Sequence, residues 1–116
     1  VRTALEAGAV AVQCGTAFLV AQEAGASAAH RAALTTGRTL MTRAISGRPA
    51  RGVENLISSR DDEKAPDYPL PYSALKVLHA AASDAGEYGY GPFWAGTGCA
   101  SAQPGSAEEI LLRLVP

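Results

Sequence analysis

Near the start of the chain an uninterrupted apolar run gives way to a polar turn. Residues 9–12 read Ala-Val-Ala-Val, and Gln13, Cys14, Gly15 and Thr16 follow directly. An apolar run without alternation is typical of a strand that is buried on both faces of a parallel sheet. Gly15 has no Cβ and Thr16 carries a hydroxyl, so we expect the turn to present backbone N–H groups to an anion at a helix N-terminus. The simpler alternative is a β–α turn that binds no ligand.

Glycine and serine positions divide the next stretch into two short helices. Residues 18–23 predict a helix that ends near Gly25. Ser27 is a favourable N-cap for the alanine-rich residues 28–34, and Gly37 is a favourable stop for that second helix.

Two amphipathic helices are predicted in the second half of the chain. The first begins at Ser73 and ends at Gly86, and the second covers residues 107–114 with Ser106 as its cap. Their apolar residues recur at helical spacing and define the faces that we expect to be buried: Leu75, Leu78 and Ala82 in the first, and Ile110, Leu111 and Leu114 in the second.

The region between the alanine-rich helix over residues 28–34 and the helix that begins at Ser73 mixes strand and loop signals. Its β-branched residues favour a strand over residues 38–45, a Ser-Gly-Arg-Pro turn ends this strand at residues 46–49, and a short helix is predicted over residues 51–57. Residues 58–67 are polar and charged and predict an exposed loop, while the prolines within residues 68–72 predict an extended segment.

The charge balance narrows the class of partner. The 116 residues contain 10 Lys and Arg against 11 Asp and Glu, which gives a net charge of −1. A nearly neutral chain is a poor match for nucleic acid or for an anionic membrane surface. The sequence has neither an apolar run of about 18 residues nor a signal-peptide pattern, so we predict no membrane partner and expect a cytoplasmic location.

Four arginines gather between residues 38 and 51. Arg43, Arg48 and Arg51 suit a bidentate clamp on a phosphate or a carboxylate, because the guanidinium group presents a planar fork of donors. The alternative, which we favour, is that these arginines pair with Asp and Glu at a domain junction.

The histidines and cysteines form no recognisable catalytic or metal-binding pattern. His30 lies in the alanine-rich helix, where we expect a partly exposed surface position, and His79 lies beside an apolar helix face, where we expect it to pack. Cys14 and Cys99 lack CxxC spacing, so we expect free thiols rather than a disulfide. We therefore predict no metal site.

Three segments resemble, in the same order, three blocks of one enzyme family. Residues 11–19 read AVQCGTAFL, residues 40–52 read LMTRAISGRPARG, and residues 93–98 read FWAGTG. They are similar to the Ala-Val-Gln-x-Gly-Thr-x-Phe-Leu, Thr-Arg-Ala-Phe-Ser-Gly-Arg-Pro-Ala-Arg-Gly and Trp-Ala-Gly-x-Gly blocks of the nitronate monooxygenases, flavin enzymes also called 2-nitropropane dioxygenases. Three ordered blocks spread over nearly the whole chain are far more specific than any one of them.

The resemblance implies an α/β fold, namely the C-terminal part of a flavin-binding (β/α)8 TIM barrel plus a smaller α/β domain. Residues 1–36 would hold the last strand of the barrel, its phosphate-binding turn and the following helices. Residues 37–92 would form the small appended domain, and residues 93–116 would return to the barrel and end in a helix packed on it. A complete barrel needs about 250 residues, so we expect the 116 residues to be a C-terminal portion.

The resemblance also implies a chemistry. It identifies the chain as part of an FMN-dependent nitronate monooxygenase, which oxidises alkyl nitronates with dioxygen to carbonyl compounds and nitrite. We expect no catalytic residue in this segment and no turnover by it alone. Trp94, Gly96 and Thr97 either border the mouth of the active site or belong to an aromatic contact between domains. The residues that we expect to contact the cofactor are Gln13, Gly15 and Thr16.

Two other functions stay open on the sequence. A flavin-dependent enoyl reductase of fatty-acid synthesis shares the barrel and a similar phosphate turn, although residues 40–52 favour the nitronate branch. A non-catalytic α/β module that binds a partner or an anion through residues 13–16 would form a stable fold by itself. If the segment belongs to a barrel, its exposed edges should favour self-association or binding of a complementing chain.

Overall fold

The computed structural model describes residues 1–60 and 62–116. Within these residues the chain is α/β in content, with helices around a two-stranded antiparallel sheet. The α-helices are α1 (Arg2–Glu6), α2 (Ala28–Leu34), α3 (Leu70–Asp84) and α4 (Ala107–Leu114), the 3₁₀ helices are η1 (Thr16–Val20), η2 (Asp62–Lys64) and η3 (Cys99–Ser101), and the strands are β1 (Thr39–Thr42) and β2 (Ala50–Val53).

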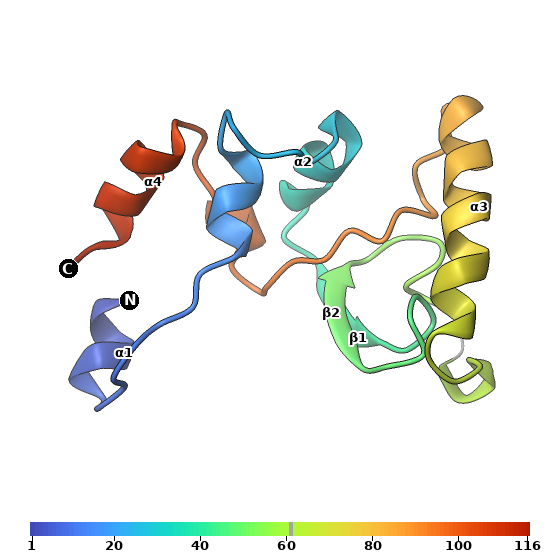
Figure 1. Ribbon diagram of the computed structural model, residues 1–116, viewed down its shortest axis with the longest axis horizontal. Coiled ribbons are helices and arrows are strands. Elements are labelled where there is room, and N and C mark those ends of the chain that lie inside the picture. The colour runs from blue at the N-terminus through green and yellow to red at the C-terminus, as the bar shows by residue number, and fades with distance from the viewer. Residues whose placement is uncertain (61) are drawn as a thin grey trace.

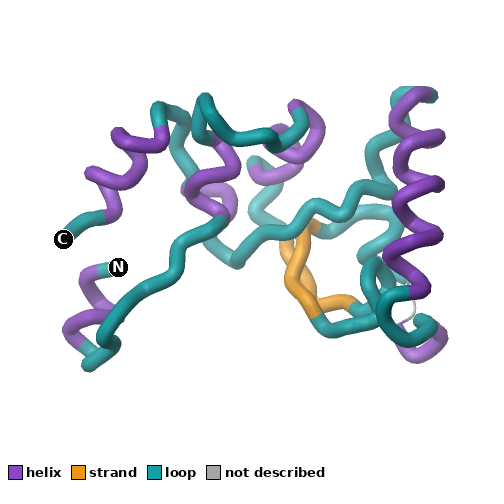
Figure 2. Tube along the Cα trace, viewed as in Figure 1, coloured by secondary structure: helices purple, strands orange, loops and turns teal. Residues whose placement is uncertain are grey.

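The elements are spread along the long axis of the molecule. Figure 1 shows α1 and α4 at one end and α3 at the other, with α2, β1 and β2 between them. The coil that leaves α3 crosses back over the molecule to η3 (Figure 2). We call residues 87–98 the return segment, residues 13–36 with 99–114 the helical lobe, and residues 39–86 the sheet lobe.

The core lies where the return segment meets the helical lobe and β2. A cluster of buried side chains from both lobes and the return segment forms this core. Burying a large aliphatic or aromatic side chain contributes about 1.5–3 kcal/mol, so the cluster holds the two lobes together. Its buried members come from both lobes and from the return segment: Val20, Ala21, Leu34, Val53, Phe93, Ala95, Cys99 and Ile110.

The return segment runs beside β2 and hydrogen-bonds to it. The backbone N–H of Val53 donates to the carbonyl of Phe93 over 2.8 Å, and the N–H of Ala95 donates to the carbonyl of Arg51 over 3.2 Å. On its other side β2 pairs with β1, from Thr39 opposite Val53 to Thr42 opposite Ala50. Pairing on both sides stabilises an extended backbone here, so the helix predicted over residues 51–57 is wrong.

The turn that follows β1 is organised by one carboxylate. Asp62 Oδ1 accepts hydrogen bonds from the Thr42 hydroxyl over 2.8 Å and from the backbone N–H groups of Arg43 and Ala44 over 2.8 and 3.1 Å. Burial by itself would raise the pKa of Asp62, but these hydrogen bonds and the nearby Arg43 charge outweigh it, so the pKa is lowered. The turn predicted over residues 46–49 is present, and Gly47 within it adopts a φ of 85°.

The strand predicted over residues 9–12 is wrong in this structure. These residues form no strand and are exposed, and Val10 is fully exposed. A parallel strand requires neighbours that accept and donate its backbone hydrogen bonds, and none of the described residues pairs with this segment. The helix predicted over residues 18–23 is also displaced, because η1 already ends at Val20.

The two serine-capped helices agree with the sequence pattern. The Ser27 hydroxyl accepts a hydrogen bond from the N–H of His30 over 3.1 Å at the start of α2. At the start of α4, Ser106 and Glu109 form a reciprocal capping box. Local signals suffice at these two positions because the cap lies within one turn of the groups that it satisfies.

Helix α3 begins earlier than predicted and buries less of its apolar face. It starts at Leu70 rather than Ser73, because Pro71 falls in the first turn, where its missing N–H costs nothing. Leu75 is buried as expected, but Leu78 remains 45% exposed. Residues 70–72 are therefore helical rather than extended.

The loop predicted over residues 58–67 is more ordered than its composition suggested. It contains η2, and Ser58 is buried, with its hydroxyl donating to the carbonyl of Val53 over 3.1 Å. Asp61, which belongs to the same predicted loop, lies outside the described residues.

Candidate cofactor site

The predicted phosphate turn lines a cavity in the helical lobe. Gln13, Gly15 and Thr16 all border a cavity of about 370 Å³, together with Cys14. The remaining lining residues come from the start of η1, from around η3 and from the end of α4: Ala17, Gly98, Ser101, Ala102 and Leu114. The structure thus brings the three predicted cofactor residues together with a part of the chain far away in sequence.

The turn leaves backbone donors open to this cavity. Gly15 is the N-cap of η1, and the first N–H groups of a helix have no acceptor within the helix. In the described part of the chain, no backbone acceptor pairs with the N–H of Gly15, Thr16 or Ala17. A Cβ placed on Gly15 would meet no atom within 4 Å, so the backbone there faces open space.

Thr16 contacts the return segment and does not cap η1. Its side chain makes no capping hydrogen bond to η1. Instead, Thr16 Oγ1 accepts a hydrogen bond from the backbone N–H of Gly96 over 2.9 Å. A hydroxyl that accepts in this way still has its own proton to donate. This contact fastens the return segment to the turn and leaves the Thr16 proton available.

The return segment meets the cavity and the turn through its glycines. Gly96 contacts Thr16, but Trp94 pairs with Gly52 of β2 in an isolated bridge. Gly98 and Ser101 line the cavity, whereas Trp94 and Thr97 do not. Gly98 is the second glycine of the Trp-Ala-Gly-x-Gly block, so the sequence resemblance could have indicated it. No sequence pattern pointed to Ser101.

The lining carries no formal charge, so any anion in the cavity would meet N–H and hydroxyl donors and no carboxylate. This donor set fits a phosphate group, because unpaired N–H groups at the start of a helical turn attract negative charge. The neutral Gln13 side chain adds an amide that can donate or accept.

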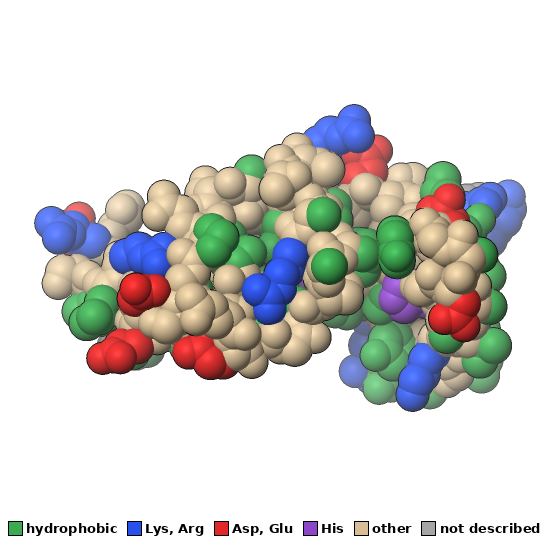
Figure 3. Space-filling view, turned by 90° about the horizontal axis from the view of Figure 1, so that it is seen from above, with side chains coloured by type: hydrophobic (Ala, Val, Ile, Leu, Met, Phe, Trp, Pro, Cys, Tyr) green, Lys and Arg blue, Asp and Glu red, His purple; other side chains and the backbone are tan. Residues whose placement is uncertain are grey.

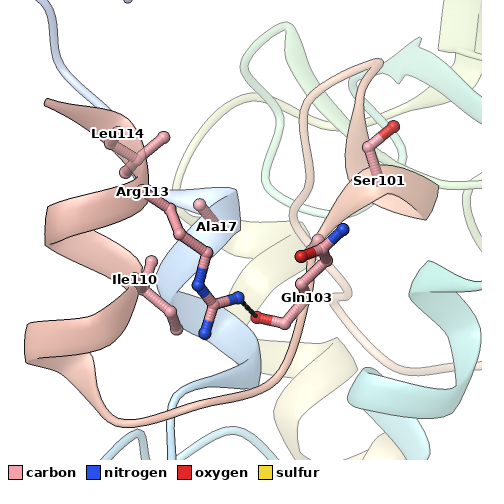
Figure 4. A pocket seen from close by; sticks show the side chains of 7 residues that line it. Ala17, Ser101, Gln103, Ile110, Arg113 and Leu114 are labelled. Carbon is pink, nitrogen blue, oxygen red and sulfur yellow. Dashed lines mark hydrogen bonds between the residues drawn. The ribbon is translucent and has the colours of Figure 1, made fainter. Parts of the chain in front are cut away.

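A smaller cavity of about 130 Å³ lies beside the first (Figure 4). Its one charged member, Arg113, donates to the carbonyls of Gln103 and Pro104 over 3.2 and 3.0 Å. The guanidinium group therefore stabilises the loop before α4. Leu114 lines both cavities and also a third, mostly apolar one of about 310 Å³.

Both histidines pack against Phe93. The His30 ring stacks on Phe93 with centroids 4.9 Å apart, and the His79 ring meets it edge-on at 6.0 Å. His30 Nε2 lies 3.1 Å from the carbonyl oxygen of Trp94 and must donate to it, because a carbonyl only accepts. Burial lowers the pKa of His30, and the hydrogen bond to Trp94 offsets this only in part. His30 is thus half-buried in a contact between lobes.

Arg43, Arg48 and Arg51 make their side-chain contacts within the sheet lobe. Arg43 pairs with Asp67 over 3.2 Å, so this arginine does pair with an acid, but within one lobe and not at a junction between domains. Arg51 instead donates to the Thr39 hydroxyl over 3.2 Å, and Arg48 lies 4.2 Å from the centroid of an aromatic ring, that of Tyr68. Among residues 1–60 and 62–116, neither of these two arginines pairs with an acid, and none of the three lines the cavity at residues 13–16.

Metal clusters, disulfides and membrane-spanning helices are absent from the described residues. No group of three or more His, Cys, Asp or Glu side chains is placed to hold a metal ion, and Cys14 and Cys99 are unpaired. No helix there has both the length and the apolar character to cross a bilayer. On the face shown in Figure 3, positive and negative side chains are scattered among apolar ones rather than gathered by sign.

Comparison with known proteins relates the whole segment to one family. The family model described as nitronate monooxygenase matches residues 1–116. The chain is 43% identical to the nitronate monooxygenase of Pseudomonas aeruginosa, with 99% of this chain and 35% of that protein covered. It is 40% identical to the nitronate monooxygenase of Paraburkholderia phytofirmans, with coverage of 98% and 33%.

A solved structure agrees with these relatives. The crystal structure of nitroalkane oxidase from Streptomyces ansochromogenes matches with a TM-score of 0.86 and 38% identity, over 95% of this chain and 33% of that one. The chain therefore spans about a third of the length of the relatives that it matches. With a match over all of its residues and these identities, the chain belongs to the nitronate monooxygenase family.

Proposed function

We propose that this chain is the C-terminal portion of an FMN-dependent nitronate monooxygenase, which converts an alkyl nitronate and dioxygen into a carbonyl compound and nitrite. Family membership supports the reaction class. The observation that carries the cofactor assignment is the cavity at residues 13–16, whose lining includes residues with unpaired backbone N–H groups and the Thr16 hydroxyl and no carboxylate.

Each of the three cofactor residues has a distinct part in the proposal. Gly15 lets the backbone approach the phosphate closely, so the N–H groups from Gly15 onward donate to its oxygens. Thr16 donates its hydroxyl proton, because its oxygen already accepts from Gly96. Gln13 contacts the phosphate or the flavin through its amide. The bound flavin supplies the electron-transfer chemistry, and this chain positions it.

The proposal also includes the barrel and the division of the chain. Residues 1–36 belong to a TIM barrel, residues 37–92 to a small appended domain, and residues 93–116 to a return that packs on the barrel. The exposed apolar residues 9–12 support this, since exposed apolar surface of this kind is typical of a region that further protein covers. The same exposed residues would favour self-association or a complementing chain.

The segment holds no residue to which we assign catalysis, so we propose that it does not turn over alone. The nitronate and dioxygen would react in the part of the enzyme built with the remaining two-thirds of the family length. A cytoplasmic location is part of the proposal, and two unpaired thiols accord with a reducing compartment.

The reaction is tested on a form extended upstream to the length of the relatives. We expect that form to carry flavin absorbance and to release nitrite from an alkyl nitronate only when dioxygen is present. The 116-residue chain, assayed in parallel, should release none.

The possible failures separate the alternatives. Flavin absorbance without nitrite release would overturn the reaction and favour an enoyl reductase-like flavin enzyme. Absence of flavin from the extended form would overturn the cofactor assignment as well, and it would favour an α/β binding module that uses residues 13–16 for another ligand.

A further inference from the structure

The cavity at residues 13–16 has a second wall that the proposed function does not yet use. Ser101 is the last residue of η3 and lines the same cavity as Thr16. Its side chain is exposed, so the hydroxyl is accessible to a ligand. The wall therefore offers a second hydroxyl to whatever the turn binds.

The position of Ser101 is fixed relative to the turn. Gly96, which donates to Thr16 Oγ1, also accepts through its carbonyl from the N–H of Cys99 over 3.1 Å. The N–H of Ser101 donates to the carbonyl of Gly98 over 3.0 Å, which closes the short helix. Cys99 is almost fully buried and anchors η3 in the core. Because these contacts are consecutive, the backbone of Ser101 is fixed at the cavity by the same contacts that hold the return segment.

The Ser101 hydroxyl is free to donate. Within residues 1–60 and 62–116, no hydrogen bond of this side chain to another protein group is recorded, in contrast to the hydroxyls of Ser27, Ser58 and Ser106. Figure 4 shows the Ser101 side chain pointing away from the Arg113 guanidinium, which is itself engaged by Gln103. A serine hydroxyl carries one donor, and a hydrogen bond to a charged phosphate oxygen is stronger than one between neutral groups.

We propose that Ser101 is a further phosphate-binding residue of the FMN site, so that η3 completes on one side the donor set that residues 13–16 provide on the other. This inference rests on the proposed FMN binding. It assigns part of the cofactor site to η3, which directly follows the return segment. It also predicts that Thr16 and Ser101 donate to the same phosphate group.

The test compares FMN with riboflavin, which has the same ring system and lacks the phosphate. The affinity of the upstream-extended form for each is measured by quenching of flavin fluorescence. Ser101→Ala should weaken FMN binding about tenfold, the effect of losing one hydrogen bond to a charged group, and should leave riboflavin binding unchanged. Ser101→Thr keeps a hydroxyl and should restore most of the FMN affinity.

A matched control is available in the sheet lobe. Ser59 is also exposed and lies away from the cavity, so Ser59→Ala should change neither affinity. Thermal unfolding of each variant establishes that the fold is retained.

Each outcome bears on one of the two claims. If the unmodified protein binds FMN and Ser101→Ala binds both ligands as well as it does, the role of Ser101 is overturned and the FMN site stands. An equal loss of FMN and riboflavin would also overturn it, because the effect would not concern the phosphate. If the unmodified protein binds no FMN, the proposed function fails and the role of Ser101 fails with it.

Discussion

The sheet lobe and the cavity side of the helical lobe differ in how fully their polar groups are paired. In the sheet lobe, Asp62 accepts three hydrogen bonds, and Ser58 both accepts from the N–H of Asn55 and donates to the carbonyl of Val53. At residues 13–17, by contrast, N–H groups face a cavity without a backbone acceptor among the described residues. The first region is complete by itself, whereas the second has the donors of a binding site.

Exposed apolar side chains occur in both regions. The sheet lobe buries Ile45 completely but leaves Val77 on α3 73% exposed, and in the segment that leads to the cavity Val10 is fully exposed. Exposed apolar residues next to unpaired donors are what we expect where further protein and a ligand belong. Substitutions should therefore affect stability in one region and binding in the other, which gives a way to test the contrast.

The largest effect is expected from Ile45→Ala in the sheet lobe. Ile45 is fully buried, and its truncation removes apolar contacts and leaves a cavity, at a cost of about 3 kcal/mol in the free energy of unfolding. Urea denaturation of the extended form measures this cost. FMN affinity at temperatures where the variant is folded should be unchanged, and a large loss of affinity would break the separation between the two regions.

Asp62→Ala should destabilise the same lobe by about 2 kcal/mol. The substitution leaves the Thr42 hydroxyl and two backbone N–H groups without their acceptor, and Thr42 is almost fully buried. Because the pKa of Asp62 is lowered on folding, its contribution is present above its ordinary value of 3.8 and is lost as the pH falls through the lower folded value.

The pH dependence offers the check on Asp62. Unfolding of the unmodified protein should show an acid-sensitive component below about pH 4 that is smaller in Asp62→Ala. An identical acid dependence in the two proteins would contradict the assigned role of this carboxylate.

A smaller effect is expected from His30, at the contact between the lobes. Burial lowers the pKa of His30 below 6.5, so the folded protein favours the neutral ring and loses stability as the pH falls through 6.5 towards the folded value. His30→Gln removes the titrating ring and keeps an N–H donor for the Trp94 carbonyl. Melting temperatures at pH 7.5 and 5.5 should differ less in the variant. An unchanged difference would exclude His30 as the source.

The smallest effect is expected from Arg38→Ala. The Arg38 to Glu54 ion pair spans 3.7 Å, and the two side chains are 75% and 43% exposed. Solvent screens such a pair, so its loss should change the free energy of unfolding by less than about 0.5 kcal/mol. A cost above about 1 kcal/mol would show that this exposed ion pair contributes more to the free energy of unfolding than we infer.

How well the sequence predicted each part depends on how local its causes are. Ser27 and Ser106 cap helices within one turn, and both helices were located correctly. β2 was mistaken for a helix because its stability comes from β1 and from the return segment, at Trp94, and neither partner is visible in the local pattern. Residues 9–12 were mistaken for a strand because an unbroken apolar run is typical of a strand that is covered on both faces. In this structure residues 9–12 are exposed.

The candidate site shows the same division. Gly15 and Thr16 follow from one turn and were named from the sequence, and they do line the cavity. The contact between Thr16 and Gly96 and the placement of Ser101 depend on the path of the return segment. That path is set by burial of Phe93 and by pairing with β2, so no spacing rule along the chain could reveal it.

The most direct test of the central claim, that residues 13–16 bind the FMN phosphate, is a titration of FMN into the upstream-extended form and two glycine variants. Gly15→Val places a side chain in the open space at the turn, and Gly25→Val is the control, since a Cβ at either glycine meets no protein atom within 4 Å. Gly15→Val should weaken FMN binding about 100-fold or more, a cost of about 2.7 kcal/mol, and Gly25→Val should bind as the unmodified protein does. Equal FMN affinity in all three proteins would contradict the claim.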